Sequence, residues 1–260
     1  MMDIDCFGHG YRISNSTVVG RRKDNEDSFA LVIRSESRYR ASSPLGERQG
    51  ECAPGELMML SVFDGMGGLS YGAEASRMVS EGLTQWALNV PIGDIDGLML
   101  SLLNALIPLE SELMNNYPDG GTTASVVIGT MEGWFSAHLG DSRCYIVDSK
   151  GGWRTSDHSK VEEMRIKGLI DEDMMNEHPL SNLVSRYVGG GHATSLEFDD
   201  IPEGWESIII CTDGAFGYMS PDDYWELMFS DFDANEIVKK AYDKGSTDNI
   251  TVLRIDLVRR

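Results

Sequence analysis

The stretch Ser61-Val62-Phe63-Asp64-Gly65-Met66-Gly67-Gly68 joins an apolar run to one acidic residue and a glycine-rich turn. The apolar residues 57–63 predict a buried strand, and the glycines allow a sharp turn and a close approach of the backbone to a ligand. A carboxylate at a strand end, followed by an unobstructed backbone carbonyl, offers the oxygen ligands that a hard cation prefers. Asp-Gly also opens ordinary turns, so this stretch alone leaves both interpretations open.

The composition limits the class of protein. The chain has 260 residues, 41% hydrophobic and 25% charged, which is typical of a soluble globular protein with one large core or two small ones. Its net charge of −20 argues against non-specific binding to nucleic acid or to anionic membranes. Four scattered cysteines without a Cys-x-x-Cys motif indicate neither a zinc cluster nor a disulfide framework. Since the sequence has no signal-peptide pattern and no apolar run of 18 residues, we expect a cytoplasmic protein with no membrane partner.

The pattern of apolar strand, aspartate and glycine occurs a second time. Asp213-Gly214 follows the apolar run 207–211 closely, Asp248 precedes the last predicted strand, and Asp141 lies in a turn between two strands. Each turn taken alone could be an ordinary connection. Their repetition in one chain favours functional carboxylates.

An acidic pair, Glu26 and Asp27, lies just before a predicted strand at 30–33 and follows the basic residues 21–23. This stretch could be a charged turn between two strands. It could also give both carboxylates to a cation and an arginine to an anion, because the planar guanidinium matches phosphate oxygens.

Helical spacing of apolar residues predicts two pairs of helices. The first pair is expected at 72–90 and about 94–115, with Pro108 kinking or breaking the second helix. The second pair is expected at about 221–229 and 234–244.

Short segments rich in β-branched and aromatic residues between 122 and 147 predict an antiparallel meander. A strand is also expected at 195–198. Residues 34–56 lack periodicity and predict a loop or a long hairpin. The polar segment 157–192 predicts two short helices and a mobile flap.

Six motifs, taken in chain order, resemble those of the metal-dependent serine/threonine protein phosphatases of the type 2C family, in its bacterial form. The motifs are Arg22-x-x-Asn25-Glu26-Asp27, Phe63-Asp64-Gly65-Met66-Gly67-Gly68, Gly121-Thr122-Thr123-Ala124, Gly140-Asp141-Ser142-Arg143, Thr212-Asp213-Gly214 and Asp248-Asn249-Ile250-Thr251. The resemblance implies an α+β fold, a four-layer α-β-β-α sandwich with two central antiparallel sheets. It also implies that residues 1–260 form a single catalytic domain. Many short strands, helices placed in pairs and the lack of βαβ alternation favour the same fold.

The resemblance further implies roles for individual residues. Asp64 is similar to the carboxylate that bridges two cations, and the Gly65 carbonyl joins one of them. Asp213 and Asp248 resemble the ligands of the second metal. Asp141, together with Asp213, resembles the site of a weaker third metal.

The segment near the N-terminus completes this set. Glu26 and Asp27 are similar to residues that hold the first metal, largely through waters, and Arg22 falls at the position of the phosphate-binding arginine. All of the metal donors are oxygens, which favours Mg²⁺ or Mn²⁺ over zinc.

The reaction implied by the resemblance is the hydrolysis of phosphoserine and phosphothreonine by a hydroxide bridging two metals, with no phosphoenzyme. Many eukaryotic members carry His where Met66 stands, and Met cannot act as the general acid. Expected partners are phosphorylated proteins, including a cognate Ser/Thr kinase. Two alternatives remain open: an inactive interaction protein with the same scaffold, and a hydrolase of small phosphoesters.

Overall fold

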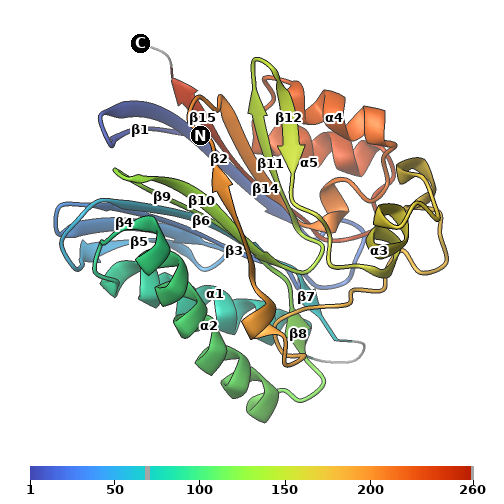
Figure 1. The fold of residues 1–260 in the computed structure, drawn as a ribbon, viewed down its shortest axis with the longest axis horizontal. Helices are drawn as coiled ribbons and strands as arrows, with labels where there is room; N and C mark the ends of the chain where they lie inside the picture. Colours follow the sequence, from blue (N-terminus) through green and yellow to red (C-terminus); the bar gives the residue numbers. More distant parts are fainter. Residues whose placement is uncertain (68–70, 259–260) are drawn as a thin grey trace.

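The structure is a computed structural model that describes residues 1–67 and 71–258. Two antiparallel sheets lie face to face, and helices cover the outer side of each (Figure 1). The predicted α+β sandwich of four layers is therefore confirmed. Gly68, the last residue of the motif around Asp64, lies outside the described residues.

The first sheet has six strands and is covered by two C-terminal helices. The strands are, in spatial order, β1 (Met2–Cys6), β2 (His9–Val18), β15 (Ile250–Val258), β14 (Ser207–Cys211), β11 (Arg143–Asp148) and β12 (Gly151–Arg154). The helices are α4 (Pro221–Phe229) and α5 (Ala234–Asp243). Ser220 caps α4, since its side chain accepts a hydrogen bond from the Asp223 amide.

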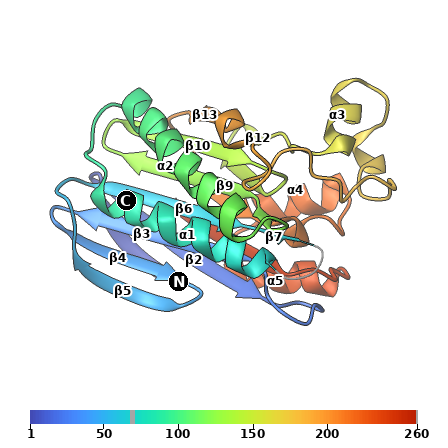
Figure 2. The ribbon, with the colours of Figure 1, turned by 90° about the horizontal axis from the view of Figure 1, so that it is seen from below.

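The second sheet has seven strands and is covered by the two longest helices (Figure 2). The strands are, in spatial order, β13 (Glu197–Ile201), β10 (Gly133–Leu139), β9 (Ala124–Thr130), β6 (Leu57–Phe63), β3 (Ser28–Ser35), β4 (Arg38–Ser43) and β5 (Gly46–Glu51). The helices are α1 (Gly72–Asn89) and α2 (Ile95–Asn116). A short pair, β7 (Gly65–Met66) and β8 (Gly121–Thr122), adjoins the end of β6.

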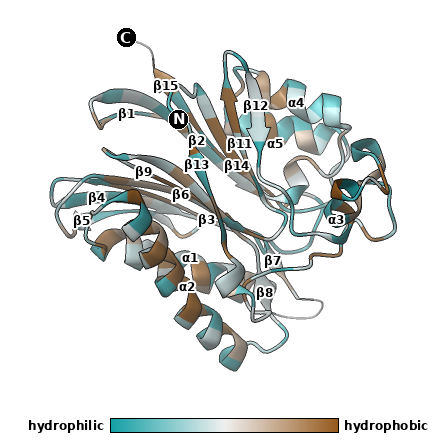
Figure 3. Cartoon of the chain, in the orientation of Figure 1, coloured by the Kyte–Doolittle hydropathy of each residue, from teal (hydrophilic) through white to brown (hydrophobic). Residues whose placement is uncertain are grey.

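Strand β6 shows why the layers form. All seven of its residues are buried, and alternate side chains enter two different cores. Met59 and Phe63 pack in the core beneath α1 and α2, whereas Met58 and Leu60 pack in the core between the sheets. A third core lies between the first sheet and α4 and α5. In Figure 3 the central strands, such as β11 and β14, are correspondingly brown.

The buried side chain of Arg34 ties β3 to the end of α1. Its guanidinium donates hydrogen bonds of 2.7–2.8 Å to four carbonyls, those of Ala87, Val90, Ala53 and Pro54. The first two belong to the last turn and C-cap of α1, where carbonyls lack helical partners and carry partial negative charge. Arg34 therefore ends the helix and fixes the following loop.

Helix α2 runs without a break through Pro108, so of the two outcomes predicted there, a kink or a break, the break is wrong. The proline ring removes one backbone hydrogen bond on an exposed face, where water can satisfy the freed carbonyl. By length and composition α2 could cross a membrane, but this is weak evidence because core helices of soluble proteins pass the same test. In this fold α2 packs on α1 and contributes Leu98 and Leu102 to the core.

Other differences from the sequence predictions concern polar strands and one crossover. The β4–β5 hairpin confirms the long hairpin, one of the two forms predicted for residues 34–56, whereas β1 and β12 were not predicted. The predicted meander is split, because β9 and β10 pair in the second sheet whereas β11 crosses to the first. The strand expected at 195–198 begins later, as β13, after the short helix η2 (Ala193–Ser195).

The flap, residues 157–192, contains α3 (Lys160–Ile166) and η1 (Glu172–Met174), in agreement with the two predicted short helices. Its C-terminal end is fixed by the buried carboxylate of Glu110 on α2. This side chain accepts hydrogen bonds of 2.9–3.0 Å from the amides of Gly189, His192 and Ala193. The triple glycine at 189–191 is thus held at both sides, and the mobility of the flap stays a prediction.

Candidate metal centre

A cavity of about 800 Å³ opens where strand ends of both sheets meet. Seven of the eight residues predicted for the site line it; they are Arg22, Glu26, Asp64, Gly65, Asp141, Asp213 and Asp248. The eighth, Asp27, is buried just behind this lining. The predicted carboxylates, distant in the chain, therefore lie around one opening.

Asp64 is positioned by threonines at the start of the neighbouring strands. Its amide donates to the Thr123 hydroxyl at 2.9 Å, and its carbonyl accepts from the Thr123 amide and the Thr122 hydroxyl, each at 2.9 Å. The Thr123 hydroxyl also lies 2.7 Å from that of Ser142, the residue after Asp141. One hydroxyl thus connects two of the acidic turns.

The glycine after Asp64 is required by close contact. A Cβ on Gly65 would lie 2.3 Å from the Gly72 carbonyl oxygen and 2.4 Å from that of Glu26. No larger residue fits there, and the Gly65 backbone can lie next to the Glu26 segment. Gly214 after Asp213 is equally confined, since its Cβ would lie 1.9 Å from the Asn249 carbonyl oxygen. Both Asp-Gly pairs therefore serve close packing of the backbone at the cavity.

Asp27 is held between the ends of β14 and β15. Its Oδ2 accepts hydrogen bonds from the hydroxyls of Thr212, at 2.9 Å, and Thr251, at 2.7 Å. Its Oδ1 is buried and has no hydrogen-bond partner among the described residues. Asp213 Oδ1 is also buried and also has no hydrogen-bond partner among the described residues. Two buried carboxylate oxygens without donors are suited to a cation or to its bound waters.

Asn249 holds the N-terminal acidic segment in place. Its side-chain oxygen accepts a hydrogen bond from the Glu26 amide at 2.8 Å, and its side-chain NH₂ donates to the carbonyls of Val19 and Asp24. The residue next to Asp248 therefore fixes the turn that carries Glu26. Arg22 in that turn donates to Asp248 at 2.6 Å and is itself more than half exposed.

The electrostatics of the cavity favour positive charge. Burial raises the pKa of Asp27 to about 7 and that of Asp213 to about 6, with nearby aspartates adding to the effect. Burial and the neighbouring aspartates also raise the pKa of Asp64 and of Asp141. Ionised carboxylates that lie around one cavity need a counter-charge. Because all of the donors are oxygens, Mg²⁺ or Mn²⁺ would fit this set.

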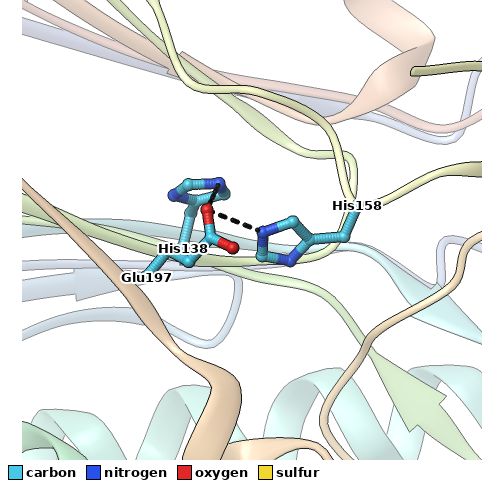
Figure 4. A group of neighbouring side chains, drawn as sticks. All are labelled: His138, His158 and Glu197. Carbon is cyan, nitrogen blue, oxygen red and sulfur yellow. Dashed lines mark ion pairs between the residues drawn. The ribbon is translucent and has the colours of Figure 1, made fainter. Parts of the chain in front are cut away.

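A second group of potential ligands lies outside the cavity lining. Within the described part of the chain, one group of three His, Cys, Asp or Glu has ligand atoms all within 4.8 Å, and it comprises His138, His158 and Glu197 (Figure 4). His158 Nδ1 accepts a hydrogen bond from the Gly140 amide at 3.1 Å, so neutral His158 carries its proton on Nε2, facing Glu197 Oε2 at 3.4 Å. His138 Nε2 lies 2.9 Å from the Ser156 carbonyl, which can only accept. The ring nitrogens nearest Glu197 therefore both carry protons, His158 Nε2 by its tautomer and His138 Nε2 by donating to Ser156, so neither offers a lone pair to a metal and the group is a structural cluster.

The site also contains a buried ion pair that the sequence did not reveal. Arg143 makes two hydrogen bonds to Asp157, at 2.8 and 2.7 Å, and its guanidinium lies 3.7 Å from the centre of the Phe216 ring. Arg154 also contacts Asp157 and reaches Glu172 on the flap at 2.9 Å. This network joins the turn after Asp141 to the base of the flap.

Known proteins share both the sequence pattern and the fold. The family model "Protein phosphatase 2C" matches residues 55–176. The "Serine/threonine phosphatase stp" of Listeria monocytogenes serotype 4b is 29% identical over 209 residues, which are 75% of this chain and 82% of that protein. In sequence and in fold the chain is therefore similar to the protein phosphatase 2C family.

Solved structures of phosphatases have the same fold as this chain. The serine/threonine phosphatase Stp1 from Staphylococcus aureus superposes with a TM-score of 0.79, at 21% identity, over 96% of this chain and 95% of that one. The catalytic domain of the phosphatase PstP in complex with 2 manganese ions gives 0.70, at 23% identity, over 96% and 99%.

The main residues missed from the sequence are Thr123, Thr212 and Thr251, which hold Asp64 and Asp27. Each lies in one of the six motifs. Thr212 directly precedes Asp213 and Thr251 follows Asp248 by three residues, which was the available signal for these two, whereas the motif of Thr123 contains no acidic residue. Met66 lines the cavity, and its thioether offers no proton.

Proposed function

We propose that this chain is a metal-dependent protein phosphatase that hydrolyses phosphoserine and phosphothreonine. The observation that carries the proposal is the cavity that gathers carboxylates from both sheets with one exposed arginine. The names of the relatives support the same activity. An inactive scaffold protein would be expected to lack one or more of Asp64, Asp213 and Asp248, and all three are present.

The residues that would hold two divalent ions are Asp64, the Gly65 carbonyl, Asp213 and Asp248, with Glu26 and Asp27 acting largely through water. Asp141 with Asp213 would hold a weaker third ion. The PstP domain bound to 2 manganese ions supports two ions of this kind. Bound Mg²⁺ or Mn²⁺ would supply Lewis acidity and would lower the pKa of a bound water towards neutrality.

Arg22 is the residue of this chain that would bind the phosphoryl group. It is exposed at the mouth of the cavity, and its planar guanidinium can donate two hydrogen bonds to phosphate oxygens. Arg143, the other arginine in the lining, is engaged by Asp157 on two atoms and is buried. Arg22 would therefore orient the substrate and stabilise the charge on the equatorial oxygens during an in-line attack by water.

Two wider predictions accompany this function. We expect the substrates to include the kinase that phosphorylates the same proteins, and we expect the protein to act in the cytoplasm.

A direct assay tests the proposal. p-Nitrophenyl phosphate and a phosphothreonine peptide are incubated with Mn²⁺ or Mg²⁺ and, separately, with EDTA. We expect metal-dependent turnover of both. Turnover of the small ester alone would indicate a small-phosphoester hydrolase, and absence of turnover with every metal would contradict the proposal.

A matched pair of arginine variants tests the role of Arg22. Arg22→Ala is expected to lower kcat/KM by about 100-fold, since an oriented donor to a developing anion is lost. Arg21→Ala is the control, because Arg21 lies over the Tyr242 ring and does not line the cavity. Equal losses in both variants would contradict the assignment.

A further inference from the structure

The cavity extends well beyond the candidate metal centre, to the flap. Its lining includes the flap residues Asp173, Asn176, Glu177, Ser181 and Asn182. A volume of about 800 Å³ exceeds what a phosphoryl group fills and lies in the range of pockets that hold larger ligands. The flap side of the cavity is therefore available for residues that flank a phosphorylated side chain.

The charge on this flap side is negative and uncompensated. Asp173 and Glu177 are both exposed, and neither takes part in an ion pair between described residues. Two basic residues, Arg22 and Arg143, lie among the described residues of the lining, and both are already paired with aspartates of the site.

The basic residues of the flap do not offset these two charges. Lys160 pairs with Glu163, Arg165 with Glu162 and Arg186 with Glu197, each at 3.0 Å or less. Lys167 is exposed outside the cavity lining. Metal ions bound by the carboxylates of the candidate metal centre would neutralise those carboxylates. They would leave the negative charges of Asp173 and Glu177 without a counter-charge.

We propose that Asp173 and Glu177 make this enzyme prefer phosphoproteins that carry a lysine or arginine close to the phosphorylated residue. The inference rests on the proposed phosphatase function and deepens it. A basic side chain beside the phosphorylated residue would be attracted by the negative charges of Asp173 and Glu177, whereas an acidic side chain there would be repelled. Asn182 and Ser181 on the same wall offer hydrogen bonds to a peptide backbone.

The experiment compares kcat/KM for phosphothreonine peptides that differ at one flanking position. Each peptide carries Lys, Ala or Glu at the third position before or after the phosphothreonine, and Mn²⁺ is present throughout. We expect the better Lys peptide to exceed its Glu counterpart by roughly 10-fold, since two exposed charge contacts each change binding by a few-fold. The preference should shrink as salt is added.

A double variant and a matched control locate the effect. Asp173→Lys/Glu177→Lys is expected to abolish or reverse the preference and to leave turnover of p-nitrophenyl phosphate near the wild-type value. Asp171→Lys/Asp222→Lys changes the net charge equally, at exposed residues outside the cavity lining, and should keep the preference. Similar losses in both double variants would assign the preference to net charge and overturn the inference.

Two outcomes separate this inference from the function on which it rests. Turnover of p-nitrophenyl phosphate with equal kcat/KM for Lys and Glu peptides would overturn the inference alone. Failure of all substrates with Mn²⁺ and Mg²⁺ would overturn the proposed function and the inference with it.

Discussion

Replacement of Asp27 by asparagine tests whether buried negative charge governs the metal-free site. Burial is the main cause that raises the pKa of this carboxyl from 3.8 to about 7. The folded metal-free protein therefore binds the proton more tightly than the unfolded chain does. The stability that Asp27 contributes is fully present below pH 3.8 and is lost as the pH rises through about 7.

The magnitude follows from these two pKa values. Relative to the protein below pH 3.8, the pKa difference of Asp27 lowers the free energy of unfolding by about 4 kcal/mol at pH 7.5 and by about 2 kcal/mol at pH 5.5. Asparagine keeps one oxygen for the hydroxyls of Thr212 and Thr251, but its NH₂ replaces an oxygen that has no donor, at a cost of about 2 kcal/mol. In EDTA the variant should therefore be about 2 kcal/mol more stable than wild type at pH 7.5, and about equal to it at pH 5.5.

Urea unfolding followed by circular dichroism at both pH values measures this difference. Asp222→Asn, at an exposed position in the first turn of α4, is the control and should lower the free energy of unfolding by less than about 1 kcal/mol, by the same amount at both pH values. The reasoning would be refuted if Asp27→Asn were less stable than wild type at pH 7.5 in EDTA, or if the difference did not depend on pH. Added Mn²⁺ should stabilise the wild type more than the variant.

Three further substitutions test other parts of the structure. Asp213→Asn should abolish metal-dependent turnover of p-nitrophenyl phosphate and leave the circular dichroism spectrum unchanged; turnover near the wild-type value would contradict the assigned role. Arg34→Met should lower the free energy of unfolding by about 3–5 kcal/mol in a urea titration, because four carbonyls, two of them in buried residues, lose their donors, and a loss below about 1 kcal/mol would contradict its role at the end of α1. Glu110→Gln should cost about 1–3 kcal/mol in the same measurement, because one of three backbone amides then faces an NH₂, and faster hydrogen exchange at residues 189–193 would locate the effect; unchanged exchange there would show that Glu110 does not fix the loop.

The sequence predicted the parts of the fold in which apolar pattern and turn chemistry agree. The range predicted for β6 is identical to the strand, because seven apolar or small residues run into Asp64-Gly65. The helices α1, α4 and α5 were predicted to within a residue or two of their ends for the same reason. The edge strands β5 and β12 carry exposed side chains without a period-two apolar pattern, so β12 was missed and the segment of β5 was predicted only as a loop or a long hairpin. Strand β1 was missed although Met2, Ile4 and Cys6 alternate with two aspartates.

The sequence could place the candidate site residues at strand ends but could not say which sheet each strand joins. The crossover of β11 from the β9–β10 hairpin to the other sheet depends on tertiary packing, and local pattern does not encode it. The hydroxyl contacts of Thr123 and Thr251 were likewise hidden, because threonine in a strand usually reflects β propensity. The lining of the cavity shows which of the candidate site residues lie around one opening.

The distribution of the carboxylates between the sheets has a mechanical consequence. Asp64 leaves the seven-stranded sheet, Asp213 and Asp248 border the six-stranded sheet, and Glu26 and Asp27 lie on the chain that passes from one to the other. Ions shared by these residues would link the two sheets. A displacement of one sheet along the other would separate the ligands of the same ion and weaken its binding, so the metal affinity would depend on the alignment of the two sheets.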